Sequence, residues 1–179
     1  MGTRGTTGFQ IDGVRKSSYQ QYDSYLDGVG LDVLNFVREI GEGEDRERVN
    51  ILARGLKIVP ESGKPTAAEI AHIGTTYLNA NVSEGNDWYA FLRETQGKPG
   101  LILDAGLVTG NESFRNEEYD YVINLDTDTL DVYAYNEQIG SLPFANLPTD
   151  EQFVKLADEP YVPAIEAAPV ERGEYTQVK

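Results

Sequence analysis

The chain has 179 residues, and 30 acidic residues against 15 basic ones give it a net charge of −15. It has no cysteine and a single histidine, His72, which excludes disulfides, thiolate metal centres and multi-histidine metal sites. So acidic a chain is repelled by nucleic-acid phosphates and anionic lipids, and no apolar run reaches the roughly 18 residues of a membrane-spanning helix. We therefore expect a cytoplasmic protein that binds neither nucleic acid directly nor a membrane.

The first predicted element is a β-hairpin at about 6–19. Residues 6–11 form a strand-like run, and residues 14–19 form the return strand. Asp12-Gly13 between them is a strong two-residue turn signal, because both central positions of a type I′ turn require positive φ. A polar, tyrosine-rich stretch follows at 19–25, and residues 26–30 are predicted to form a loop.

Four to five helices are predicted after this loop. The clearest is 31–40, where Val33, Phe36, Val37 and Ile40 share one helical face and Gly41 can end the helix. Thr66 with Glu69, and Thr149 with Gln152, are capping-box pairs that predict helix starts. The remaining helical predictions are 45–56, a helix from 67 that carries His72, Tyr77 and Leu78, the segment 84–96, and a short helix ending at 156.

The last third of the chain is predicted to be mainly β-structure. Residues 101–108 are a strand candidate, and alternation over 119–135 predicts a second β-hairpin. Residues 101–157 hold eleven acidic and two basic residues. The alternation places Asp120, Asn124 and Asp126 on the solvent face, which predicts an exposed acidic patch at 117–131.

The order of these elements predicts an α+β fold with a single layered domain. We expect the domain to span 1–157 and to contain the two hairpins with the helices packed beside them. Residues 158–179 contain three prolines and scattered acids, and we expect them to form an extended acidic tail.

The best candidate for a binding site is the tyrosine-rich stretch. Hydroxyl, phenol and carboxylate groups directly after a strand could line a small-molecule pocket, with Arg4 at the start of the neighbouring strand. The alternative is that the tyrosines pack and that Asp23-Ser24 only caps a turn. The candidate binding residues are Arg4, Tyr19, Tyr22, Asp23, Ser24 and Tyr25.

Metal and cofactor sites are not expected. The acids from Asp126 to Glu137 have calcium-loop length, but Leu130 and Asp131 stand where an oxygen ligand and a glycine are needed. A lone histidine on a predicted helix is more often a packing or capping residue than a general base. We therefore expect no metal and no cofactor.

The N-terminal pattern resembles a family of uncharacterised proteins from bacteriophages and actinobacteria. The pattern is Gly2-Thr3-Arg4-Gly5, Gly8-Phe9, Asp12-Gly13, Lys16, Tyr19, Asp23-Ser24-Tyr25, Gly28 and Gly30, and the hairpin at 121–133 with Leu142-Pro143 fits it too. Relatives often carry histidine and proline where this chain has Gln21 and Leu26. The resemblance implies a phage or prophage source.

Two classes of function follow as hypotheses. The first is a non-enzymatic phage accessory protein that binds a host protein or a small ligand in the host cytoplasm, with a counter-defence role as one form and a virion-associated structural role as another. The second rests on a likeness to the opening of N-terminal-nucleophile hydrolases, and would make the fold Ntn-hydrolase-like. It is an amidohydrolase in which Thr3 is the nucleophile, with Arg4, Asp23 and Ser24 lining the site, after removal of residues 1 and 2. The absence of a reactive residue set favours the non-enzymatic role.

Overall fold

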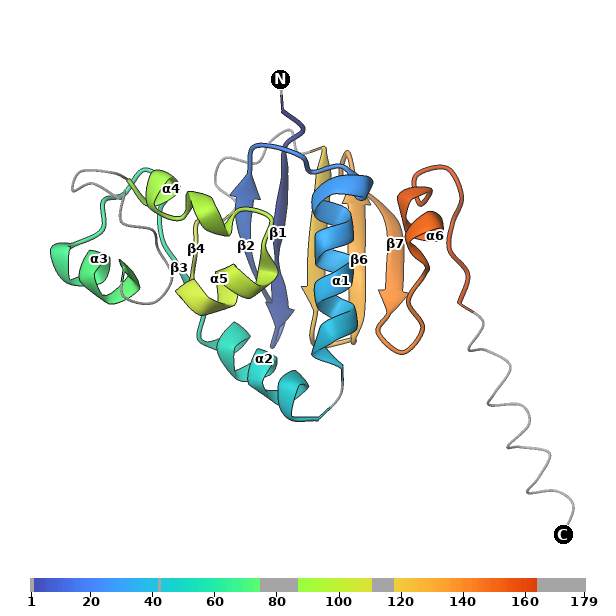
Figure 1. Cartoon of the computed structure of the whole chain (residues 1–179), viewed down its shortest axis with the longest axis horizontal. Coiled ribbons are helices and arrows are strands. Elements are labelled where there is room, and N and C mark those ends of the chain that lie inside the picture. The colour runs from blue at the N-terminus through green and yellow to red at the C-terminus, as the bar shows by residue number, and fades with distance from the viewer. Residues whose placement is uncertain (1, 42, 75–86, 111–117, 164–179) are drawn as a thin grey trace, which may run out of the picture.

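A five-stranded mixed sheet forms the centre of the protein. The computed structural model describes residues 2–41, 43–74, 87–110 and 118–163. The strand order in the sheet is β2-β1-β5-β6-β7 (Figure 1). The strands are β1 (Gly5–Ile11), β2 (Val14–Gln20), β5 (Tyr119–Asn124), β6 (Thr129–Ala134) and β7 (Glu137–Pro143). Beside β2 lies a short parallel pair, β3 (Lys57–Ile58) and β4 (Leu107–Val108).

Both predicted hairpins are confirmed. In the turn of the β1–β2 hairpin, Asp12 has φ of 53° and Gly13 has φ of 74°, as a type I′ turn requires. The β5–β6 hairpin pairs Tyr119 with Ala134 and Asn124 with Thr129. A parallel pairing of β1 with β5 joins the two hairpins into one sheet.

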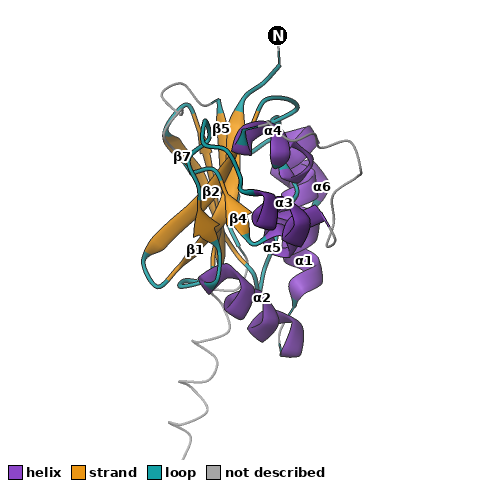
Figure 2. Cartoon of the chain, turned by 90° about the vertical axis from the view of Figure 1, so that its left-hand side faces the viewer, coloured by secondary structure: helices purple, strands orange, loops and turns teal. Residues whose placement is uncertain are grey.

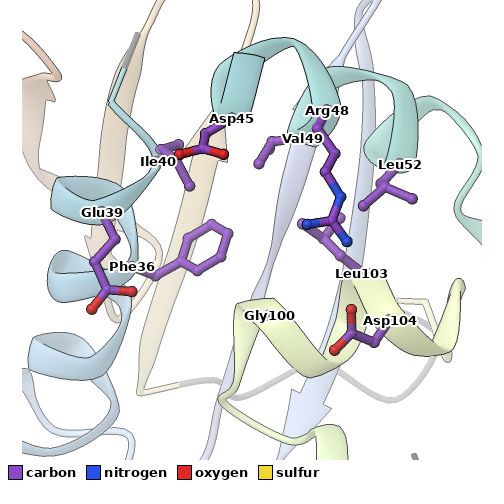
Figure 3. A pocket seen from close by; sticks show the side chains of 10 residues that line it. All are labelled: Phe36, Glu39, Ile40, Asp45, Arg48, Val49, Leu52, Gly100, Leu103 and Asp104. Atoms are coloured by element: carbon purple, nitrogen blue, oxygen red, sulfur yellow. The ribbon is translucent and has the colours of Figure 1, made fainter. Parts of the chain in front are cut away.

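The helices lie on one side of this sheet (Figure 2). They are α1 (Leu31–Ile40), α2 (Glu44–Arg54), α3 (Ala67–Gly74), α4 (Trp88–Phe91), α5 (Pro99–Ala105) and α6 (Asp150–Val154). Two irregular turns, η1 (Leu26–Gly30) and η2 (Arg93–Thr95), precede α1 and α5. Helices α1, α2 and α5 meet around one gap in the helical layer (Figure 3). The predicted layered α+β fold is therefore confirmed.

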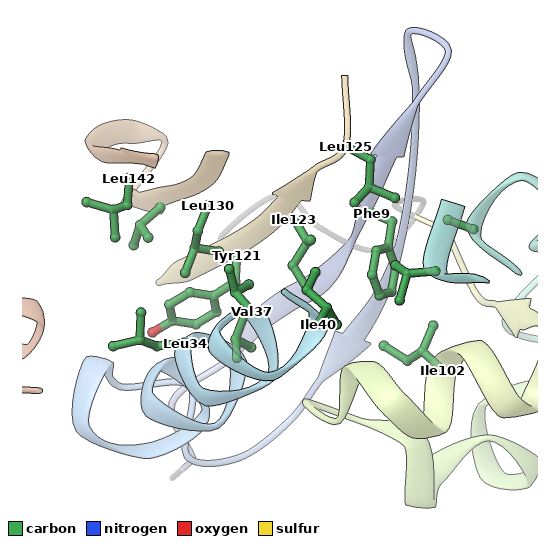
Figure 4. Packing of buried hydrophobic residues seen from close by; sticks show 14 of the residues in the cluster. Phe9, Leu34, Val37, Ile40, Ile102, Tyr121, Ile123, Leu125, Leu130 and Leu142 are labelled. Atoms are coloured by element: carbon green, nitrogen blue, oxygen red, sulfur yellow. The ribbon is translucent and has the colours of Figure 1, made fainter. Parts of the chain in front are cut away.

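The main core lies between α1 and the sheet. Leu34, Val37 and Ile40 on α1 pack against Tyr121 and Ile123 on β5 (Figure 4). A second, smaller cluster of buried residues lies around α3 and α4 and consists of Val59, Ile73, Trp88, Phe91 and Leu92. The predicted inward face of 31–40 is confirmed for Val33, Val37 and Ile40, with Leu34 buried beside them, whereas Phe36 is only partly buried.

The predicted caps are present. The Thr66 hydroxyl accepts the Glu69 N–H, and the Glu69 carboxylate accepts the Thr66 N–H. Thr149 and Gln152 form the same reciprocal pair at the start of α6. Gly41, with φ of 48°, follows α1 in a conformation that favours glycine.

The prediction of a strand at 101–108 is wrong. The segment forms α5, with Pro99 at its first position and Gly106 in the left-handed conformation after its end. Pro is preorganised for a helix start and Gly for a helix stop, so these flanks outweigh the short apolar run between them. Only the last two residues of the predicted strand, β4, are extended.

Other boundaries also differ from the predictions. The helix predicted at 84–96 is two short elements, α4 and η2, separated by Leu92, while 84–86 lie outside the described residues. Tyr77 and Leu78 of the helix predicted from 67 lie outside them too. Strand β7 was not predicted, and the described part of the chain holds six α-helices rather than four to five.

The prediction of an exposed acidic patch at 117–131 is wrong for two of its five described acids. Asp120 is only 4% exposed and accepts the Thr6 hydroxyl at 2.7 Å, while Arg15 lies 4.0 Å away. Asp131 is 8% exposed and accepts hydrogen bonds from three side chains: Asn124, Thr129 and Ser141. These carboxylates are buried because hydroxyl and amide donors from neighbouring strands satisfy them.

The exposed acids of this hairpin join elements together. The Asp126 carboxylate accepts the backbone N–H groups of Asp12 and Gly13 at 2.7 and 2.9 Å. Asp128 forms an ion pair with Arg46 of α2. The acids at this turn therefore bind the rest of the fold rather than forming a free surface.

The end of the described chain packs against the domain. The Tyr161 hydroxyl donates to Asn146 at 3.0 Å, and the ring adds to the edge of the main core. Residues 164–179 of the predicted tail lie outside the described residues. None of the helices that the structure describes is long and apolar enough to span a bilayer.

Candidate functional site

The tyrosine-rich segment forms a tight loop between β2 and α1. Asp23 takes the left-handed conformation (φ 58°), and its carbonyl accepts the Val29 N–H at 2.8 Å. A Cβ on Gly28 would lie 2.4 Å from the same carbonyl oxygen, so this closure requires glycine. The loop leaves Tyr22 and Tyr25 more than half exposed, at 55% and 51%.

A groove of about 600 Å³ separates this loop from the segment 93–98. We call it the tyrosine-loop groove. The Gln21 N–H donates to the Gln96 side-chain oxygen at 3.2 Å and links the two walls. A Cβ on Gly97 would lie 2.8 Å from Val29, so the walls also meet closely at the floor. The groove is therefore held by contacts between segments that lie some 70 residues apart in the chain.

Charges of both signs line the tyrosine-loop groove. Acidic residues come from the loop and α1, and basic residues come from the opposite wall. They are Asp23, Asp27, Asp32, Arg93 and Lys98. All five are exposed, and within the described ranges none of them forms a salt bridge. The groove thus offers separate positive and negative groups to a ligand.

A row of three tyrosines extends the groove across the end of the sheet. The Tyr25 and Tyr119 ring centroids lie 6.4 Å apart, and those of Tyr119 and Tyr135 lie 6.3 Å apart. Burial raises the pKa of Tyr119, with Tyr135 and Glu118 adding to the effect. The three rings are tilted against one another, with interplanar angles of 58° and 51°, and form a continuous aromatic row.

Tyr135 holds an unusual backbone position in this row. It has φ of 50° in the turn between β6 and β7, and it is 68% exposed. A bulky residue is a rare choice at positive φ, and the conformation costs about 1–3 kcal/mol. The turn imposes this conformation, because Tyr135 and Asn136 are the two central residues between paired Ala134 and Glu137, and a type I′ turn requires positive φ at both.

The six predicted binding residues separate into three places. Tyr22, Asp23 and Tyr25 line the groove. Arg4 and Tyr19 are not among the residues that line it, and burial raises the pKa of Tyr19 while the Arg4 guanidinium opposes the rise.

Ser24, the sixth residue, is fully buried. Its N–H donates to the Thr3 carbonyl at 3.2 Å, and its own carbonyl accepts the Tyr121 hydroxyl at 2.7 Å. Its side chain therefore lies behind the loop rather than in the groove.

Sequence reasoning missed the opposite wall. Arg93 and Gln96 lie within the predicted helix 84–96, Lys98 lies beyond it in no predicted element, and no local pattern connects them with residues 22–32. The one local signal was Gly97, whose positive φ of 71° accompanies the close contact with Val29.

A second polar cluster lies behind the loop, at the start of β1. Thr3 is 3% exposed, and a Cβ on Gly2 would lie 2.3 Å from the Tyr22 ring, so residue 2 sits beneath that ring. The Ser24 hydroxyl and the Gln20 amide nitrogen are buried and have no hydrogen-bond partner. Unpaired buried polar atoms are costly, and they require an explanation in any folded protein.

His72 lies exposed on α3. Across the described segments, no group of three or more acidic or histidine side chains is placed to hold a metal ion. Comparison of the chain with protein-family models, with curated proteins and with solved structures gives no match.

Proposed function

We propose that this protein is a non-enzymatic binding protein, and that the tyrosine-loop groove takes a ligand with both a positive and a negative charge. The observation that carries the proposal is the set of five charged side chains of both signs around one groove, without salt bridges in the described structure. A short peptide of a partner protein or a small zwitterion has the matching chemistry.

The two walls suit different ends of such a ligand. Arg93 and Lys98 can each donate charge-assisted hydrogen bonds to a carboxylate. Asp23, Asp27 and Asp32 can accept hydrogen bonds from an ammonium group on the loop side. Tyr25 stands at the mouth and leads to the aromatic row, where an apolar or aromatic side chain of the ligand can stack.

The resemblance to phage proteins supplies the biological setting of the proposal. In that setting the partner is a host protein or a small molecule in the host cytoplasm, and the binding serves a counter-defence role. A virion-associated structural role is the alternative in the same class. Mass spectrometry of purified particles separates the two, because only a virion protein is retained in them.

Titration calorimetry tests the groove with glycyl-phenylalanine as the zwitterionic probe. Its acetylated and amidated form, which carries no charge, is the matched ligand control. We expect the free dipeptide to bind and the blocked form to bind at least tenfold more weakly.

A double variant, Arg93→Glu with Lys98→Glu, is expected to abolish the binding. The control, Lys64→Glu with Lys155→Glu, makes the same change of charge at exposed lysines outside the groove and should bind as the parent does. Equal binding of free and blocked peptide, or equal loss in both double variants, would overturn the proposal.

A second candidate function is N-terminal-nucleophile hydrolysis with Thr3 as the nucleophile. The buried polar cluster supports it, because removal of residues 1 and 2 would uncover Thr3 beside two polar groups that lack partners. The Thr3 hydroxyl would then attack an amide carbonyl carbon, and the new α-amino group would accept its proton. The amide C–N bond would break as the amino group passes this proton to the leaving amine, and water would hydrolyse the ester left on Thr3. Arg4 is the neighbouring charged group.

Intact mass spectrometry of the purified protein tests this candidate. The mechanism requires a chain that begins at Thr3. A mass that corresponds to a chain beginning at Gly2 or at Met1 contradicts it.

A further inference from the structure

A second groove lies between α1, α2 and α5, on the outer side of the helical layer. A cavity of about 200 Å³ has apolar side chains on its floor, among them Phe36, Leu52 and Leu103 (Figure 3). Phe36 points into the gap between the three helices, and its ring also contacts Phe9 of the core, with centroids 6.0 Å apart. The groove thus gives a ligand access to an aromatic ring anchored in the core.

The cavity continues along α1. A neighbouring cavity of about 480 Å³ shares Phe36, Glu39, Gly100 and Asp104 with it and extends to Asp32. Asp32, Phe36 and Glu39 lie on one face of α1, at i, i+4 and i+7. We call the two cavities together the α1–α5 groove. A helix of ten residues is about 15 Å long, so the groove can hold two to three helical turns.

Gly100 keeps this groove open. A Cβ at this position would lie 3.9 Å from the Phe36 ring and would meet nothing else within 4 Å. A side chain would therefore fit there without strain and would cover Phe36. The glycine leaves an apolar floor exposed although the packing does not require it.

The rim of the α1–α5 groove is mainly acidic. Its charged side chains are exposed, and within the described ranges they form no salt bridge. They are Asp32, Glu39, Asp45, Arg48, Lys98 and Asp104. Four acids against two bases attract a cationic partner to the apolar floor.

We propose that the α1–α5 groove binds a basic amphipathic helix of a partner protein. The apolar stripe of such a helix would pack on Phe36, Leu52 and Leu103, and its flanking lysines or arginines would face the acids of the rim. A second copy of this chain fits poorly, because its net charge of −15 would meet another acidic surface. The proposal goes beyond the proposed function, since this surface shares only Asp32 and Lys98 with the tyrosine-loop groove.

The probe is a fluorescein-labelled 14-residue helix of leucine and lysine, with the leucines on one face. A scrambled peptide of the same composition, without an apolar face, is the matched control. Fluorescence anisotropy with the full chain should show binding of the helix at least tenfold tighter than binding of the scrambled peptide. Binding should weaken as salt is added, because the rim contributes charge attraction.

Substitutions at Gly100 measure the contribution of the apolar floor to binding, and charge reversals on the rim measure the contribution of the acidic side chains. Gly100→Gln fills the groove without a change of charge and should weaken binding at least tenfold, while Gly100→Ala should stay within twofold of the parent. The double variant Glu39→Lys with Asp104→Lys should weaken binding as strongly, whereas Glu137→Lys with Glu151→Lys, at exposed sites outside the groove, should not. Circular dichroism and thermal melting establish that each variant folds.

Several results would overturn the proposal. They are equal binding of the scrambled peptide, unchanged binding by Gly100→Gln, and self-association that Gly100→Gln abolishes, which would make a second copy the occupant. Glycyl-phenylalanine binding by Gly100→Gln should equal that of the parent, so failure at this groove is distinct from failure at the tyrosine-loop groove.

Discussion

At the scale of single residues, Tyr121 connects the core to the tyrosine-rich loop. Its ring is fully buried on β5, and its hydroxyl donates to the Ser24 carbonyl at 2.7 Å. Burial raises the pKa of this hydroxyl far above its usual range. The loop that lines the candidate groove is therefore held from behind by a neutral phenol.

Replacing Tyr121 by Phe should lower the free energy of unfolding by about 1–3 kcal/mol, because the Ser24 carbonyl loses its donor while it stays buried. Urea unfolding measures the loss. The control is Tyr135→Phe, which changes an exposed hydroxyl and should leave the stability nearly unchanged.

The same phenol predicts a loss of stability at high pH. Unfolded tyrosine ionises near pH 10, whereas folded Tyr121 keeps its proton, so only the unfolded state releases a proton there. The contribution of Tyr121 to stability should be constant below about pH 10, and stability should fall above it. The fall should be shallower in Tyr121→Phe but still present, because the pKa values of Tyr19 and Tyr119 are raised too. An equal slope in both proteins would contradict this assignment.

At the scale of elements, the capping box at the start of α6 should stabilise that helix, and single substitutions at Thr149 can test this. Thr149 accepts the Gln152 N–H, and Gln152 accepts the Thr149 N–H. Thr149→Ala removes one half of the pair and should cost about 1 kcal/mol of unfolding free energy, whereas Thr149→Ser should retain most of it. Urea midpoints of the two variants measure the difference, and equal midpoints would argue against the cap.

Asp126 joins the turns of the two hairpins, which lie more than one hundred residues apart in sequence. Asp126→Ala leaves the Asp12 and Gly13 N–H groups to water and should cost about 1 kcal/mol. Asp126→Asn keeps an acceptor oxygen and should cost less. Hydrogen exchange of the Gly13 amide should be faster in Asp126→Ala, and unchanged exchange would show that this contact does not hold the turn.

At the scale of the whole molecule, Tyr161 sets where the folded unit can end. Its hydroxyl contacts Asn146, and its ring packs on the core, beyond the boundary at 157 that the sequence predicts. A chain ended after residue 157 should be less stable by about 1–2 kcal/mol than a chain ended after 163. Thermal melting of the two chains measures the difference, with Tyr161→Ala in the full chain as the check.

Local patterns predicted those parts of the fold where a few adjacent residues carry the whole physical reason. The Asp12-Gly13 turn, the apolar face of α1 and both capping boxes belong to this group. The prediction for 101–108 was wrong because a short apolar run fits a buried strand and a buried helix equally well. The flanking residues Pro99 and Gly106 favour the helix that the structure shows.

Only one wall of the tyrosine-loop groove could be predicted from the sequence. Tyr22, Asp23 and Tyr25 line the groove, but Arg93 and Lys98 come from a segment with no local signal of their position. Asp120 illustrates the same limit. Alternation places it on a sheet face, yet its burial depends on Thr6, which only the parallel pairing of β1 with β5 brings beside it.

The sequence by itself determined the α+β class, both hairpins and the main helix, because backbone preferences and apolar periodicity act over a few neighbouring residues. The tertiary structure alone decided which acids are buried, which charges face one another across a groove, and where Gly100 leaves an aromatic ring uncovered. These features depend on contacts between segments far apart in the chain, and packing sets such contacts only when the whole domain has folded.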